Sequence, residues 1–358
     1  MHVALVYNLK KDSHDAEEPG AGPSSQNITD VSTQVEAVTK SADTYAEWDT
    51  RETIAAVHDA LALRHSVAMI EADEEAFEKL RLDRPDIVFN IAEGRYGASR
   101  EAQIPAMLEM LDIPYTGSDP LTLALCLDKS RAKEILSYHS IPTPEFFVIR
   151  SIDELSSAGI SFPCIVKPLY EGSSKGIFNS SLVGSWEDLV GQVERIIDSY
   201  NQPALIEKFL PGREFTVAML GNGDTLRILP IVEIKFDSLP QGVNPIYSFE
   251  AKWIWDEANN PLDIFDCPAR LTSTLLTAIE KICRKAFTIL RCRDWCRIDV
   301  RLDGAGIPHI MELNPLPGIL PNPEENSCFP KAARAAGLSY NEMLNKVLDA
   351  ACSRYGLA

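Results

Sequence analysis

The sequence has 358 residues, of which 45% are apolar and 24% charged, a composition typical of a globular protein with two or three domains. Its net charge of −18 argues against nucleic acid or an anionic membrane as a partner, although local lysines could still bind a nucleotide. The eight cysteines lack the close pairing of a zinc site, and no apolar run approaches ~18 residues, so we expect a cytoplasmic protein outside the membrane.

The first third of the chain alternates strand and helix patterns. Apolar runs predict strands over residues 3–7, 66–71 and 85–91, and helical spacing predicts helices over 50–64, 74–82 and 101–111. This alternation favours an α/β domain with a doubly wound parallel sheet, whose ligands lie at the carboxyl ends of its strands. No GxGxxG supports a dinucleotide site. Residues 12–46 are acidic and rich in Ser and Thr, so we expect a surface insertion whose deletion costs little stability.

A turn-rich junction near residue 118 ends this domain. The expected later helices cover residues 121–140, 152–158, 186–199, 272–290 and 340–354, and the expected later strands cover 146–149, 164–168, 204–207, 214–220, 227–234, 297–302 and 308–314. We predict three domains, an N-terminal substrate-side domain over 1–118, a central lobe over 119–205 and a C-terminal lobe over 206–358.

The last two strands form a predicted hairpin with chemically useful side chains. Side chains two apart share a face, so Arg297 and Asp299 point one way, and Glu312 and Asn314 share a face on the partner strand. Such oxygens suit Mg²⁺, and an arginine beside them could stabilise transition-state charge. From spacing alone, an ordinary hairpin with solvated charges is an equal alternative.

A Gly/Ser loop over residues 171–177 follows the strand that carries Lys167. Its backbone N–H groups could wrap phosphate oxygens, although a flexible turn is the commoner reason for such a loop. Lys167 either extends its ammonium to solvent or reaches a phosphate.

Several motifs in one order resemble the ATP-grasp superfamily, and most closely its D-alanine–D-alanine ligase branch, over about residues 85–350. The motifs are Val166-Lys167-Pro168, Glu171-Gly172-Ser173-Ser174-Lys175-Gly176-Ile177, Ile206-Glu207-Lys208-Phe209-Leu210, Glu214-Phe215-Thr216-Val217, Glu250-Ala251-Lys252, and Asp299 with Glu312-Leu313-Asn314. Motifs spaced in one order are far more specific than any one alone.

The resemblance implies a two-lobed ATP-grasp fold after the N-terminal domain, with ATP between the lobes. Residues expected at ATP are Lys129, Lys167, Glu171, Ser173, Ser174, Glu207, Lys208, Leu210, Glu214 and Lys252. Of these, Glu207, Lys208 and Leu210 would line the base, and Glu214 would hold the ribose. Metal ligands would be Asp299, Glu312 and Asn314, for two Mg²⁺ ions that Mn²⁺ could replace. Catalytic residues would be Arg297, Lys252, Ser174 and the Gly318 backbone N–H.

The substrate half departs from the family pattern. No glutamate follows the first strand in a Gly-rich turn, where the family holds the amino group of the first D-alanine. Glu93 stands where the family has histidine, and the Ser/Thr-rich segment expected after Gly318 is replaced. We interpret Glu93, Arg95 and Arg100 as a grip for an amino acid, with a helix-capping acid and two solvated arginines as an equal alternative.

The sequence thus predicts an ATP-dependent ligase that joins a carboxylate to an amine through an acyl phosphate, with an amino acid among its small-molecule substrates. The alternatives are a D-alanine–D-alanine ligase proper and an ATP-binding regulatory protein without activity, although the latter has little need of Arg297. The family also suggests a homodimer, by analogy alone.

Overall fold

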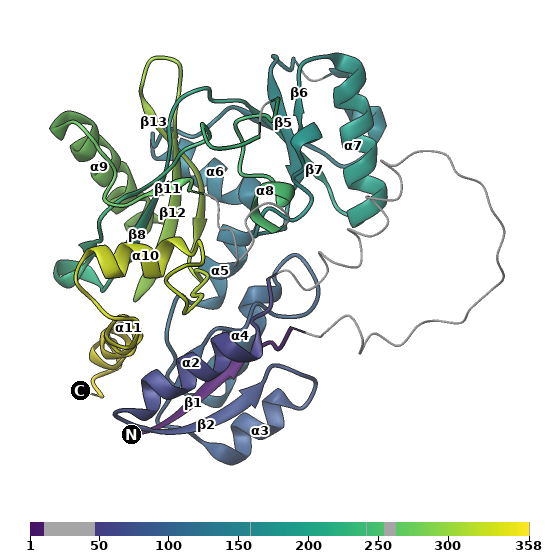
Figure 1. The fold of residues 1–358 in the computed structure, drawn as a ribbon. Coiled ribbons are helices and arrows are strands. Elements are labelled where there is room, and N and C mark those ends of the chain that lie inside the picture. Colours follow the sequence, from purple (N-terminus) through teal and green to yellow (C-terminus); the bar gives the residue numbers. More distant parts are fainter. Residues whose placement is uncertain (11–46, 158, 241, 254–262, 358) are drawn as a thin grey trace.

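The computed structural model describes residues 1–10, 47–157, 159–240, 242–253 and 263–357. These residues form three sheets, with the N-terminal sheet at the bottom of Figure 1 and the two others above it. The predicted insertion over residues 12–46 lies outside the described residues. Within them, no helix is long and apolar enough to cross a membrane.

The N-terminal sheet is parallel, with strand order β2-β1-β3. Its elements are β1 (His2–Tyr7), α2 (Arg51–Ala62), β2 (Ser66–Glu71), α3 (Ala76–Asp83), β3 (Ile87–Asn90), the 3₁₀ turn η1 (Arg100–Ala102) and α4 (Gln103–Leu111). Alternate residues of β1 face opposite layers. Val3 and Leu5 belong to the apolar cluster with α2, whereas Ala4 and Val6 belong to the cluster with α3 and α4. The predicted doubly wound layering is confirmed.

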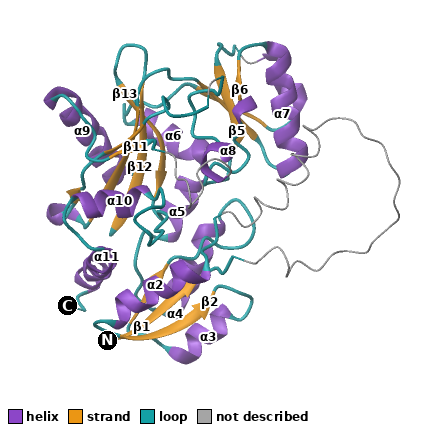
Figure 2. Cartoon of the chain, in the orientation of Figure 1, coloured by secondary structure: helices purple, strands orange, loops and turns teal. Residues whose placement is uncertain are grey.

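The central sheet is antiparallel, with strand order β4-β7-β5-β6. Its elements are β4 (Phe146–Ile149), η2 (Ile152–Ser157), β5 (Cys164–Pro168), η3 (Asn179–Ser181), β6 (Leu182–Val183), α7 (Trp186–Tyr200) and β7 (Ala204–Lys208). Helix α7 covers one face of this sheet (Figure 2). Its residues Leu189, Val193 and Ile196 are buried in the apolar cluster between the helix and the sheet. Because β7 pairs with β4 and β5 along its length, we propose that the boundary set between residues 205 and 206 lies after Lys208 instead.

The third sheet has the order β11-β10-β8-β12-β13, with β9 paired to β8. Its strands are β8 (Glu214–Leu220), β9 (Arg227–Ile228), β10 (Val232–Ile234), β11 (Phe265–Asp266), β12 (Trp295–Leu302) and β13 (Pro308–Asn314). Its helices are α5 (Pro120–Leu127), α6 (Lys129–Tyr138), α8 (Phe249–Trp253), α9 (Ser273–Ile289), α10 (Cys328–Ala335) and α11 (Tyr340–Tyr355). Val217, Ile298 and Val300 pack with α9 on one face. The intervening residues Thr216, Arg297 and Asp299 therefore face the central sheet side, where the cavity lies.

The single helix predicted over residues 121–140 is wrong, because two helices meet at Asp128. This residue has φ −79° and ψ 93°, and its carboxylate accepts from the backbone N–H groups of Ser130 and Arg131. Asp128 thus ends α5 and caps α6, which fixes Lys129 in the first turn of the second helix. The strand expected over 227–234 is also divided, into β9 and β10.

Candidate active site

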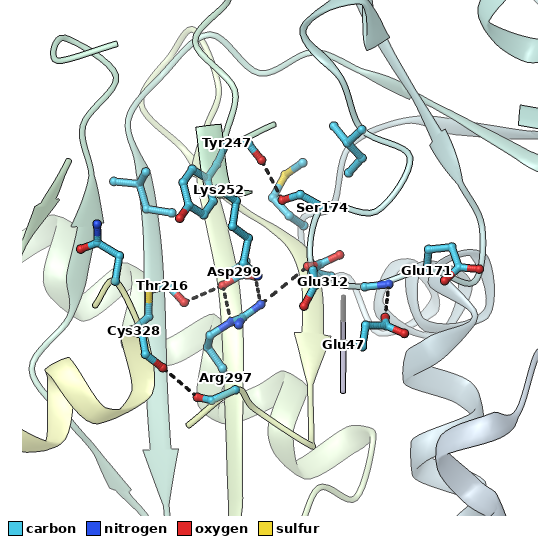
Figure 3. Close-up of a pocket in the computed structure, with 18 of the residues that line it drawn as sticks. Glu47, Glu171, Ser174, Thr216, Tyr247, Lys252, Arg297, Asp299, Glu312 and Cys328 are labelled. Atoms are coloured by element: carbon cyan, nitrogen blue, oxygen red, sulfur yellow. Dashed lines mark hydrogen bonds and ion pairs between the residues drawn. The ribbon is translucent and has the colours of Figure 1, made fainter. Parts of the chain in front are cut away.

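The β12–β13 hairpin brings the predicted carboxylates together. Asp299 is paired with Glu312, and Arg297 with Asn314, across the two strands. The Arg297 guanidinium donates to both Asp299 oxygens at 3.1 and 2.9 Å, and Thr216 Oγ1 donates to Asp299 Oδ1 at 2.5 Å (Figure 3). The described residues contain no group of three His, Cys, Asp or Glu side chains suited to a metal. The candidate cation site therefore consists of two carboxylates and the Asn314 amide.

The pKa values of the two carboxylates are shifted in opposite directions. Burial raises the pKa of Asp299, although Arg297 opposes this. Burial also acts to raise the pKa of Glu312, but the positive charges of Lys129, Lys167 and Arg297 outweigh it and lower that pKa to about 2. Glu312 therefore stays ionised at neutral pH, which suits a ligand for a hard cation.

The Gly/Ser loop takes a conformation that exposes backbone donors. Ser173, Ser174 and Gly176 all have positive φ, and Ser174 Oγ donates to the carbonyl of Tyr247 at 2.8 Å. At Gly176 a Cβ would lie 2.4 Å from the Pro168 ring, so a side chain is excluded there. A loop held in this way can cradle an anion with its N–H groups.

Two buried lysines extend from separate elements to the cavity beside the loop. Lys129 of α6 and Lys167 of β5 are each 5% exposed, and Lys129 donates to the carbonyl of Glu171. Burial lowers the pKa of Lys129. Burial also acts to lower the pKa of Lys167, but the negative charges of Glu207 and Glu312 together outweigh it and raise that pKa. Both ammonium groups suit phosphate oxygens.

The cavity that contains most of the predicted site residues, termed the main cavity, has a volume of about 240 Å³ and is lined by residues of both the central and the third sheet. Its walls bring together most of the predicted site, namely Lys129, Lys167, Glu171, Ser173, Ser174, Glu214, Lys252, Arg297, Asp299, Glu312 and Gly318. Burial, and then Arg297, lower the pKa of Lys252 to about 8. Glu214 accepts from Arg301 at 2.8 Å, which fixes its carboxylate at the wall.

A second cavity of about 100 Å³ adjoins the first and contains the predicted Glu93. Asn314 and Gly318 line it as well, so it reaches the cation site. Burial and the nearby Glu101 raise the pKa of Glu93 well above its ordinary value. Burial likewise raises the pKa of Glu101 to about 7. Carboxylates crowded in this way favour a cationic ligand that relieves their repulsion.

Glu47 is a site residue that sequence reasoning missed. Its carboxylate accepts from the Gly172 backbone N–H at 2.7 Å and from Arg100 at 2.6 Å. Glu47 lines both cavities, and Figure 3 shows it in one of them. The insertion separates it from β1, so a search directly after the first strand fails. The available indication was its place three residues before Thr50, the N-cap of α2.

Arg95 and Arg100 do not lie where the sequence analysis expected. Arg95 forms an ion pair with Glu74 at the protein surface, outside both cavities. Arg100 is 7% exposed and donates to Glu47, Glu171 and the Tyr170 carbonyl. Its charge is thus used to join the Gly/Ser loop to the segment around Glu47.

The predicted base-binding strand presents its side chains away from the cavity. Glu207 is fully buried between Lys133 and Lys167, with N–O distances of 2.7 Å to each. Lys208 is exposed and 3.9 Å from Glu145, and Leu210 is buried in the protein. None of the three side chains lines either cavity, so contacts to a base would come from the backbone.

The segment after Gly318 forms a loop that Ser327 holds together. Ser327 Oγ accepts from the Leu320 N–H and donates to the Gly318 carbonyl, both at 3.2 Å. Both hydrogen bonds of the Ser327 hydroxyl are therefore made to the backbone of its own loop. Apolar Ile319 and Leu320 stand at the cavity beside it.

The chain resembles known proteins along most of its length. The family model described as "D-ala D-ala ligase C-terminus" matches residues 135–349. The chain is 32% identical over 313 residues to a D-alanine–D-alanine ligase of Pelotomaculum thermopropionicum, covering 84% of this chain and 92% of that one. It is 37% identical over 299 residues to "uncharacterized protein y4sG" of Sinorhizobium fredii, covering 81% and 84%.

The fold also matches a solved structure. A D-alanine–D-alanine ligase from Bacillus anthracis, complexed with ATP, superposes with a TM-score of 0.66 over 99% of both chains, at 22% identity. This likeness confirms the expected ATP-grasp architecture.

Proposed function

The chain belongs to the D-alanine–D-alanine ligase family of ATP-dependent ligases, and on this basis we propose that it joins a carboxylate to an amine, with an amino acid as one substrate. The observation that carries this proposal is the position of Arg297 and Lys252 beside Asp299 and Glu312, facing one cavity. A protein that only binds ATP has little need of an arginine at that place. Cytoplasmic location and a homodimer remain predictions.

We propose that Asp299, Glu312 and Asn314 hold Mg²⁺, in one or two ions. The donor set fits a hard cation, because it consists of oxygen atoms on paired strands and Glu312 stays ionised. When bound, Mg²⁺ would draw charge from phosphate oxygens. Thr216, which donates to Asp299, would orient this ligand from the neighbouring strand.

The ATP site follows from the loop and the buried lysines. The backbone N–H groups of the Gly/Ser loop and the ammonium groups of Lys129 and Lys167 would hold the phosphates. Ser174 keeps the loop closed through its bond to Tyr247. Glu214 lines the cavity and would accept from the ribose hydroxyls, and the backbone near Leu210 would contact the base.

The chemistry needs no covalent nucleophile from the protein. A substrate carboxylate oxygen attacks the γ-phosphorus of ATP, and ADP leaves, so an acyl phosphate forms. The amine then attacks the acyl carbon, and the tetrahedral intermediate releases phosphate to give the amide. Lys252 would neutralise the transferring phosphoryl group, while Arg297 and the Gly318 N–H would stabilise the oxyanion.

The amino group of the carboxylate substrate would lie against Glu47 and Glu93. Both carboxylates line the second cavity, which adjoins the cation site. Glu47 would thus replace the glutamate that is missing directly after the first strand, and Glu93 would add a carboxyl group where the family has histidine. Because Ser327 is engaged within its own loop, we favour a substrate pair other than two D-alanines. D-alanine–D-alanine synthesis is the second candidate, since several relatives bear that name.

The test is release of ADP from ATP and Mg²⁺ across a panel of single and paired D- and L-amino acids. The proposal predicts ADP release that depends on an amine. ATP binding without amine-dependent turnover anywhere in the panel would support the inactive regulatory protein instead.

A further inference from the structure

Lys133 is a buried lysine that the chemistry above does not use. It lies one turn after Lys129 on α6, so the two side chains share a helix face. Lys129 lines the main cavity, whereas Lys133 lies behind it and is 1% exposed. A buried ammonium is costly unless it has partners, so its contacts indicate its purpose.

Glu207 is the charged partner of Lys133. Its Oε1 lies 2.7 Å from Lys133 Nζ and its Oε2 lies 2.7 Å from Lys167 Nζ. One fully buried carboxylate thus forms ion pairs with two ammonium groups, so the three side chains together carry one excess positive charge. Of the three side chains only Lys167 lines the cavity.

A hydroxyl extends this group to the cation hairpin. Lys133 Nζ donates to Thr143 Oγ1 at 2.9 Å, and Thr143 Oγ1 donates to the Ile310 carbonyl at 2.9 Å. Ile310 lies in β13, two residues before Glu312. Lys133 therefore connects α6, the central sheet and the strand that carries a predicted metal ligand.

The charges show what this arrangement does. If Lys167 were the only partner of Glu207, the pair would be neutral toward the cavity and its ammonium would be drawn away from a phosphate. With Lys133 present, Glu207 keeps a partner when Lys167 turns to a phosphate oxygen. We propose that Lys133 is a positioning residue for the nucleotide, which compensates Glu207 so that Lys167 offers its charge to the phosphates. This inference rests on the proposed ATP site.

The experiment measures the affinity of the full-length chain for the non-hydrolysable analogue AMP-PNP with Mg²⁺, by calorimetry. Lys133→Met should weaken binding by about tenfold or more, the effect of one charge-assisted hydrogen bond. Lys133→Arg should restore most of the affinity, and the KM of the amino-acid substrate should not change. Arg131→Met, on the exposed face of the same helix, is the matched control and should bind as the wild type does.

A double variant separates compensation from packing. If Lys133 acts through Glu207, then Lys133→Met combined with Glu207→Gln should bind the analogue more tightly than Lys133→Met alone, because the uncompensated carboxylate is gone. If Lys133→Met fails to fold, the charge-balanced double variant is compared with the wild type instead. Additive or greater loss in the double variant, or unchanged affinity in Lys133→Met, would overturn the inference. A wild type that does not bind AMP-PNP would instead refute the proposed function.

Discussion

The guanidinium of Arg297 lies against the carboxylate of Asp299, with two hydrogen bonds of 3.1 and 2.9 Å between residues two apart on β12. Asn314 adds a third side-chain hydrogen bond to Asp299 from the paired strand, at 3.3 Å, and Thr216 adds a fourth. The proposed metal ligand and the proposed oxyanion residue thus fix each other's orientation. Each can be tested by a conservative substitution, which keeps the side-chain volume at Asp299 and the positive charge at Arg297.

Asp299→Asn and Glu312→Gln should each abolish Mg²⁺-dependent ADP release while the fold survives. Both changes remove a charged oxygen ligand and keep the side-chain volume. Turnover and the melting temperature check the two parts of this prediction. Asp303→Asn, in the turn of the same hairpin, is the control and should keep its activity. Activity like that of the wild type in either site variant would remove that residue from the metal site.

Arg297→Lys should lower kcat by about 10²–10³-fold, the usual effect of losing one oxyanion donor. A lysine keeps the charge but loses the paired donors of the guanidinium. The affinity for AMP-PNP should barely change, because the loss concerns the transition state. A large loss of nucleotide affinity with unchanged kcat would place Arg297 at ATP binding alone.

Glu93→Gln should lower kcat/KM for the amino-acid substrate by about tenfold or more, since one charge-assisted hydrogen bond is worth roughly 1.5–3 kcal/mol. The KM for ATP should barely move, because Glu93 lines only the second cavity. Glu75→Gln, an exposed acid of the same domain, is the control. Unchanged kinetics for every ligated substrate, or an effect limited to ATP, would leave the amino group unlocated.

The hairpin and the βα alternation could be predicted because both depend on local periodicity. Residues two apart on a strand must share a face, and this rule alone places Arg297 beside Asp299. Arg100 could not be placed in this way, since its partners Glu47 and Glu171 are 53 and 71 residues distant in the sequence. In the folded chain the buried Arg100 forms ion pairs with these two carboxylates.

The break at Asp128 shows a second limit. The apolar pattern continues through residues 121–140, and periodicity alone cannot decide whether an aspartate within it is a helical residue or a cap. Lys133, Lys167 and Glu207 show the same limit. They lie on three separate elements, α6, β5 and β7, and meet only in the folded chain, so no local pattern predicts their contact.

Glu101 should make the free energy of unfolding fall as the pH rises from about 4.5 to 7. Burial raises its pKa from the ordinary 4.5 to about 7, so the folded chain keeps a proton that the unfolded chain releases. The stability is complete below pH 4.5 and is lost through the folded-state pKa. Relative to the wild type, Glu101→Gln should therefore be more stable at pH 8 than at pH 5.

Urea unfolding of the ligand-free chain at both pH values measures this difference. The shift of Glu312, whose pKa is lowered, acts below pH 4.5 and does not enter the comparison. A stability difference between variant and wild type that is the same at pH 5 and pH 8 would show that Glu101 titrates normally.

The acyl-phosphate route is tested most directly by oxygen transfer. The substrate pair that gives the fastest ADP release would be supplied with ¹⁸O in the carboxylate, and the released phosphate analysed by mass spectrometry. The proposed chemistry predicts one ¹⁸O atom in each phosphate, matched by one amide product. ADP release with unlabelled phosphate, or without an amide product, would contradict it.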